Sequence, residues 1–148
     1  MNDALTAARQ SWMAVLARAS RVELEAALRG LRELPACEEV RPAEAGTVMV
    51  EARAGGTGAR FNLGEATAVR CTVRIGAFLG FSYCLGRDRA KALLAAQFDA
   101  LLQDPARRDA LLATVIAPLK EAQSQARAIA SRKAAATQAE FFTFVRGD

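Results

Sequence analysis

The chain has 148 residues, of which 52% are hydrophobic and 24% are charged, a balance typical of a globular domain rather than of a disordered or fibrous chain. It carries 20 Lys and Arg against 16 Asp and Glu, so a net charge of +4 favours anionic partners without requiring nucleic acid. There is no His, which excludes Ser-His-Asp and Cys-His catalytic sets and any zinc site that needs imidazole.

The first two elements are predicted to be helices. Apolar residues at helical spacing, Trp12 among them, indicate a helix over about 3–18. Ser20 stands three residues before Glu23, the spacing of a capping box in which each side chain satisfies a free backbone N–H of the other residue. We therefore expect a second helix that starts at Ser20 and ends at Pro35, because proline disrupts the helical hydrogen bonds.

A period of two then predicts strands over 47–53, 67–75 and 79–85, with 37–41 as a weaker fourth candidate. The connections at 42–46 and 76–78 are short enough for hairpins. We expect an antiparallel sheet of about four strands, each with one buried face. In the last strand the large side chains share the apolar face, opposite Gly80, Ser82 and Cys84; they are Leu79, Phe81, Tyr83 and Leu85.

Helical spacing returns after Asp88, which is placed to cap the next helix. One apolar stripe runs over 90–102 until Asp104-Pro105, and a second runs over 111–119, where Pro118 should end or kink the helix or occupy the first turn of the next. Residues 119–139 are Ala-rich and predict a helix ~30 Å long. The order of a helix pair, an antiparallel sheet and C-terminal helices is α+β in class, and we expect residues 1–148 to form a single domain.

Cysteine usage and hydropathy bear on the environment of the protein. Cys37, Cys71 and Cys84 are far apart and form no C-x-x-C pair, so neither a metal site nor a disulfide framework is predicted. Cys71 and Cys84 are expected to be inert packing residues within strands. Reduced thiols are typical of the cytoplasm. No apolar run approaches the ~20 residues that cross a bilayer, so we expect a cytoplasmic protein without membrane or nucleic-acid partners.

The Gly-rich segment 53–60 is the strongest candidate for chemistry. Its glycines allow positive φ and successive backbone N–H groups that can bind a phosphate, flanked by two arginines. No Walker A lysine follows and a strand rather than a helix comes next, so a plain turn between strands remains the alternative. The candidate phosphate-binding residues are Arg53, Gly55, Gly56, Thr57, Gly58, Arg60 and, farther along, Arg87.

The other polar residues do not form a catalytic set, and no catalytic residue is predicted. Arg70 and Arg74 share a strand face, where they can bind phosphate, pair with carboxylates of another subunit or simply face solvent. Glu44 and Glu65 are isolated carboxylates without an evident acid–base partner. The C-terminal aromatic cluster exceeds what a small core needs and indicates an interface, carried by Phe141, Phe142, Phe144 and Arg146.

Several separated segments, in order, resemble the G-subunit family (PhnG) of the bacterial carbon–phosphorus lyase system. They are QSWMAVLA at 10–17, GGTGARF at 55–61, GEAT at 64–67 with Arg70, LGRD at 85–88 and FFTFVRGD at 141–148. The resemblance spans essentially the whole chain.

The resemblance implies a role in phosphonate catabolism, within a core complex that contains the H, I and J subunits. Together with the L subunit, the G, H and I subunits are associated with a reaction in which methylphosphonate displaces adenine from the ribose of ATP. The product is α-D-ribose 1-methylphosphonate 5-triphosphate. The I subunit is regarded as the main catalytic component, and the iron–sulfur radical step belongs to J, whose Cys cluster this chain lacks.

On this basis we expect an accessory subunit that binds no cofactor alone, with ATP as a substrate of the complex. The alternative is a self-sufficient small phosphate-ester-binding enzyme that uses the Gly-rich loop.

Overall fold

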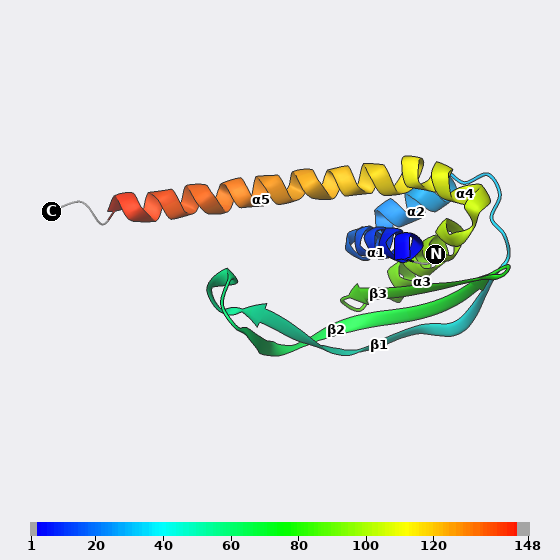
Figure 1. Ribbon diagram of the computed structural model, residues 1–148, viewed down its shortest axis with the longest axis horizontal. Helices are drawn as coiled ribbons and strands as arrows, with labels where there is room; N and C mark the ends of the chain where they lie inside the picture. Colours follow the sequence, from blue (N-terminus) through cyan, green and yellow to red (C-terminus); the bar gives the residue numbers. More distant parts are fainter. Residues whose placement is uncertain (1–2, 145–148) are drawn as a thin grey trace.

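The computed structural model describes the backbone of residues 3–144 and the side chains of residues 3–137 (Figure 1). The α+β class is confirmed, with helices before and after an antiparallel sheet of three strands rather than about four. The elements are α1 (Asp3–Arg18), α2 (Arg21–Arg29), β1 (Cys37–Arg53), η1 (Ala54–Gly56), β2 (Arg60–Ile75), β3 (Phe78–Leu85), α3 (Arg89–Gln103), α4 (Pro105–Leu111), η2 (Leu112–Ile116) and α5 (Ala117–Phe144).

The predicted helix caps are confirmed. The Ser20 hydroxyl accepts a hydrogen bond from the Glu23 N–H at 3.2 Å, and the Glu23 carboxylate accepts from the Ser20 N–H at 2.8 Å. Asp88 accepts from the Lys91 N–H at 3.0 Å and caps α3. The expected end of the second helix at Pro35 is wrong, because α2 ends at Arg29 and the N–H of the following Gly30 donates to carbonyls of its last turn.

The sheet has the order β1-β2-β3, and β1 is one continuous strand. The separate strand at 37–41 and the hairpin at 42–46 are therefore wrong. Register shifts between Glu39 and Arg41 and between Arg41 and Glu44 accommodate Pro42, since a bulge tolerates a residue without an N–H. The predicted hairpin at 76–78 is confirmed, and Gly76 adopts the positive φ of 58° that its turn requires.

The β1–β2 hairpin extends well beyond the third strand. β3 pairs with β2 only from Ala68 to Ile75, so residues 46–53 and 60–67 continue as a two-stranded ribbon, called the ribbon below. The ribbon and α5 project from the same side of the body (Figure 1). A lone two-stranded hairpin is marginally stable in water, which makes the ribbon an element that benefits from a partner.

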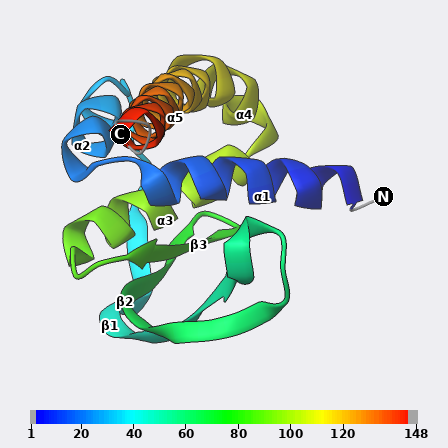
Figure 2. The same cartoon turned by 90° about the vertical axis from the view of Figure 1, so that its left-hand side faces the viewer.

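The core lies between one face of the sheet and the helices, which Figure 2 shows stacked on that face. Trp12 and Leu16 of α1 and Phe98 of α3 are almost fully buried there, beside Val69 and Val73 of β2. An Ala-rich face of α3 meets β3, and the buried alanines are Ala92, Ala95, Ala96 and Ala100.

The orientation of β3 is the main departure from the sequence-based expectation. Gly80, Ser82 and Cys84 face the core, while the large apolar side chains point outward with 38–68% of their surface exposed: Leu79, Phe81, Tyr83 and Leu85. The cause is the close approach of α3. A Cβ on Gly80 would overlap the Ala96 carbonyl oxygen and lie 2.7 Å from the Ala100 nitrogen, so only small residues fit on that face.

The C-terminal helices form a nearly continuous rod. The π-helical segment η2 precedes α5, whose first turn contains Pro118, one of the two outcomes predicted for that proline. Gln123 is the last half-buried residue among the described side chains of α5, and its Nε2 donates to the Val15 carbonyl at 2.9 Å. The described part of the helix beyond it is exposed on all sides.

Candidate functional site

The Gly-rich loop forms the tip of the ribbon. Gly55 and Gly56 have φ values of 61° and 82°, which confirms that the turn uses the conformational freedom of glycine. The N–H groups of Thr57 and Gly58 both donate to the Ala54 carbonyl, the latter at 2.8 Å. Because those two donors are engaged within the turn, only part of the predicted phosphate cradle is free to face a ligand.

Arg53 and Arg60 stand opposite each other at the base of this turn. The Arg53 Nη1 donates to the Gly58 carbonyl at 3.4 Å, and the Arg60 Nη1 lies 3.8 Å from a Glu51 carboxylate oxygen. All these side chains are exposed, so the contacts are weak and the guanidinium groups can turn toward an anion. The tip therefore presents two exposed cations beside a Gly-rich turn.

Arg87 lies elsewhere, in the connection between β3 and α3. It lines a hollow of about 510 Å³ at the root of the ribbon, together with Arg89, Thr47 and Thr67. Thr47 is separated from Arg53 by a stretch of β1 that spans ~20 Å at about 3.3 Å per residue. The structure thus gathers the 53–60 residues at the tip but does not bring Arg87 to them.

The root hollow adjoins the outer face of the sheet, where Arg70 and Arg74 lie. Arg70 pairs with Glu44 at 3.6 Å, and Arg74 pairs with Glu38 at 3.7 Å. Both pairs are half or more exposed, so they contribute little to stability. Of the three possibilities for these arginines, the structure shows a solvated face whose cations meet carboxylates of the same chain.

Sequence reasoning missed the most extensive polar network, which surrounds the buried carboxylate of Asp99. Its Oδ1 accepts from the Trp12 Nε1 at 2.8 Å and from the Arg9 Nε at 3.1 Å. Its Oδ2 accepts from the Arg9 Nη2 at 2.7 Å and from the Phe81 N–H at 2.9 Å. Arg9 also lies over the Phe81 ring, with its Cζ 5.4 Å from the ring centre. The sequence did contain one indication of this network, because Asp99 is an acidic residue inside an otherwise apolar helical stripe.

The prediction that Cys71 and Cys84 are packing residues is confirmed. Cys71 and Cys84 are buried, and burial raises the pKa of both thiols, that of Cys71 to about 11. A thiol with a raised pKa is a poor nucleophile near neutral pH. Cys37 is exposed. Within residues 3–137, no group of three His, Cys, Asp or Glu side chains is arranged to hold a metal ion.

The predicted C-terminal interface is only partly described. The backbone of α5 remains helical through Phe144, so Phe141, Phe142 and Phe144 belong to its last turns. The positions of their side chains, and Arg146 altogether, lie outside the described residues. In the part of the chain that the structure describes, no helix is both long enough and apolar enough to span a membrane.

Comparison with known proteins tests the resemblance directly. The family model of the phosphonate metabolism protein PhnG matches residues 7–147. A relative from Rhizobium meliloti (strain 1021), named alpha-D-ribose 1-methylphosphonate 5-triphosphate synthase subunit PhnG, is 44% identical over 151 residues, which cover 99% of this chain and 94% of the relative. The resemblance seen in the separated sequence segments is thereby confirmed, and the chain belongs to the PhnG family of phosphonate metabolism proteins.

Proposed function

We propose that this chain is an accessory subunit of a multi-subunit synthase that forms α-D-ribose 1-methylphosphonate 5-triphosphate from ATP and methylphosphonate, with release of adenine. The proposal rests on the Rhizobium meliloti relative, which is named as a subunit of that synthase and is 44% identical over nearly the full length of both chains. In this proposal the chain binds no cofactor alone, and ATP is a substrate of the assembled complex.

The carboxylates near the candidate anion sites support an accessory rather than a catalytic role. Glu51 at the tip faces Arg60, and Glu44 beside the root hollow faces Arg70. Each of these exposed carboxylates is paired with an arginine of the same chain, and no His is present to complete an acid–base set with either of them.

The two projecting elements are the surfaces that we assign to partner subunits. The ribbon exposes three large apolar side chains, with 45–65% of their surface accessible: Met49, Phe61 and Leu63. Between residues 122 and 137, α5 carries three cations and no carboxylate: Arg127, Arg132 and Lys133. We assign these surfaces to the H, I and J subunits of the carbon–phosphorus lyase core complex, with the L subunit as a functional partner.

A reconstitution experiment tests the accessory role. Purified H, I and L subunits are mixed with ATP and methylphosphonate, with or without this chain, and adenine release is measured. We expect adenine release only with the chain present, and none from the chain alone. Turnover by the lone chain comparable to that of the mixture would support the self-sufficient phosphate-ester-binding enzyme instead, and full turnover without the chain would contradict both ideas.

The ribbon tip is proposed to complete a triphosphate site whose walls come from partner subunits. Replacing Arg53 or Arg60 by Ala should raise the KM for ATP of the reconstituted complex about tenfold to a hundredfold, because a charge-assisted hydrogen bond contributes ~1.5–3 kcal/mol. Arg74→Ala is the matched control, since Arg74 is an exposed arginine paired with Glu38 away from the tip. Unchanged kinetics in both tip variants, with intact assembly, would show that the loop is only a structural turn and does not bind the triphosphate.

A further inference from the structure

The free edge of β3 is closed over one half and open over the other. In the closed half, the Leu79 carbonyl accepts from the Gln103 Nε2 at 2.6 Å and from the Arg9 Nη2 at 3.3 Å. The Phe81 N–H donates to Asp99 at 2.9 Å. Side chains thus satisfy the backbone groups there and block an incoming strand, a common way for proteins to protect a sheet edge.

The pairing register identifies the groups of the open half. The Gly86 N–H donates to the Thr67 carbonyl, so residues at even positions of β3 bond to β2 and those at odd positions direct their N–H and C=O groups outward. Among the hydrogen bonds of the described residues, none reaches the Phe81 carbonyl, either backbone group of Tyr83 or the Leu85 N–H. These groups form an unpaired ladder over 81–85.

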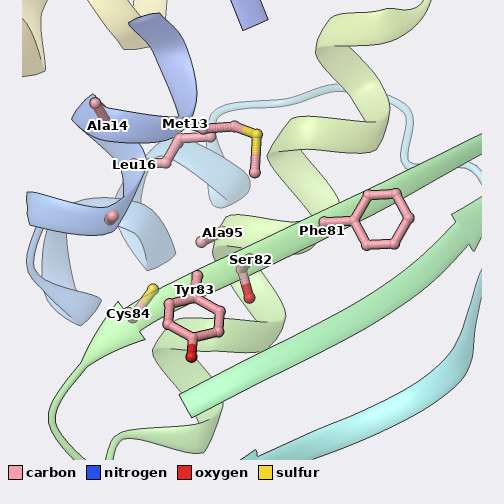
Figure 3. Close-up of a pocket in the computed structure, with 9 residues that line it drawn as sticks. Met13, Ala14, Leu16, Phe81, Ser82, Tyr83, Cys84 and Ala95 are labelled. Atoms are coloured by element: carbon pink, nitrogen blue, oxygen red, sulfur yellow. The ribbon is translucent and has the colours of Figure 1, made fainter. Parts of the chain in front are cut away.

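An apolar groove of about 230 Å³ lies directly beside this ladder, between α1 and β3 (Figure 3). Met13 and Leu16 of α1 form one side, and Ser82 to Cys84 of β3 form the other. Alanines of α1 and α3 leave room between the two elements; they are Ala14, Ala17 and Ala95. The groove is positioned to receive side chains of a strand that pairs with the ladder.

We propose that the open half of the β3 edge takes an extended, mainly apolar segment of a partner subunit as a fourth strand. This inference rests on the proposed function, because it requires a partner subunit. The free N–H and C=O groups require an extended backbone in the bound segment, and the groove requires apolar side chains on it.

Two other occupants fit the geometry less well. A second copy that paired its own β3 across a two-fold axis would bring its α1 to the same edge, and the 230 Å³ groove has no room for another helix. The chain's own C-terminus is carried away by α5, whose backbone runs from Gln123 to Phe144 over ~30 Å.

The test uses the full chain and purified H, I and J subunits. Tyr83→Pro removes an outward N–H without touching the β2 ladder, and Leu79→Pro is the matched control because its N–H also points outward but lies in the closed half. We expect Tyr83→Pro to weaken association at least about tenfold and Leu79→Pro to leave it within about twofold. Ala14→Arg, which fills the groove from α1, should weaken association as Tyr83→Pro does.

Hydrogen exchange of the wild-type chain provides a readout that does not depend on how the variants fold. The amides of Tyr83 and Leu85 should exchange rapidly in the lone chain and become protected in the complex. The proposal is overturned if these amides exchange equally fast in the complex, or if Tyr83→Pro assembles like the wild type. Protection that instead grows with the concentration of the lone chain would identify a second copy and overturn the partner strand. If the wild-type chain does not associate with the subunits, the proposed function itself fails.

Discussion

Replacing Asp99 by Asn should destabilise the chain strongly, although the two side chains are nearly equal in size. Asp99 Oδ1 accepts from Trp12 and Arg9, and Oδ2 accepts from Arg9, the Phe81 N–H and, at the long distance of 3.5 Å, Gln103. An asparagine has one acceptor oxygen, so its NH2 group must face donors in either orientation. One buried donor pair then loses its acceptor, whichever way the amide turns.

The size of the effect follows from the burial of the site. Asp99 and its Trp12 partner are 0% and 1% exposed, so water does not replace the lost acceptor. An unsatisfied buried donor costs about 1–3 kcal/mol, and losing one member of a buried ion pair costs about 3–5 kcal/mol. The Arg9 side chain remains 28% exposed and can be hydrated. We therefore expect a loss at the lower end of the range for a broken buried ion pair, about 3 kcal/mol. For a chain of this length, that corresponds to a fall in Tm of roughly 6–12 °C.

Urea unfolding followed by tryptophan fluorescence measures this loss directly, because Trp12 is the single tryptophan and contacts Asp99. Arg21→Ala is the control, since it removes an exposed ion pair with Glu25 that should contribute little to stability. The Phe81 amide should also exchange faster in Asp99→Asn. A free energy of unfolding within about 0.5 kcal/mol of the wild type would refute the reasoning that Asp99 is the acceptor for these buried donors.

Three further predictions follow from packing, thiol burial and the C-terminal helix. Gly80→Ala should cost about 1–3 kcal/mol or more in chemical unfolding, because its Cβ overlaps the Ala96 carbonyl, whereas Gly46→Ala meets no atom within 4 Å and should be close to neutral. Burial raises the pKa of Cys71 to about 11 from its ordinary value of 9.0, so the unfolded thiol ionises first. The free energy of unfolding should then fall as pH rises from 9 toward 11, and Cys71→Ala should flatten this fall. A chain truncated after Glu140 should keep its Tm but lose association with partner subunits; a fall in Tm would place the Phe cluster in the chain's own core.

Local features of the fold could be predicted because their causes lie within a few residues. The capping box at Ser20 and the cap at Asp88 depend on side chains that reach backbone groups of the same turn. The Gly76 turn depends on one residue that adopts positive φ readily. The Ala-rich C-terminal helix depends on composition alone.

Features that depend on distant packing could not be predicted in the same way. The outward face of β3 follows from the close approach of Ala96 and Ala100 to Gly80, a contact between two elements that periodicity does not reveal. The continuity of β1 through Pro42 depends on bulges in its pairing with β2. The separation of Arg87 from the Gly-rich tip is set by the length of the ribbon. Strand signals predicted its β1 half at 47–53 but missed its β2 half, because they placed the start of that strand at residue 67 rather than at Arg60.

The exposed apolar stripe on β3 and the open half of its edge have one physical origin. Small residues on the inner face let α3 settle close to the sheet, and the large residues of the strand then have only the outer face to occupy. Leu79, Phe81, Tyr83 and Leu85 expose apolar surface in a continuous row, which costs solubility in a free monomer. A partner strand added at 81–85 would lay its own side chains beside this row, pairing them across the strands as in any antiparallel sheet. The same event would satisfy the free ladder and cover part of the row, so the two irregularities of β3 point to one interface.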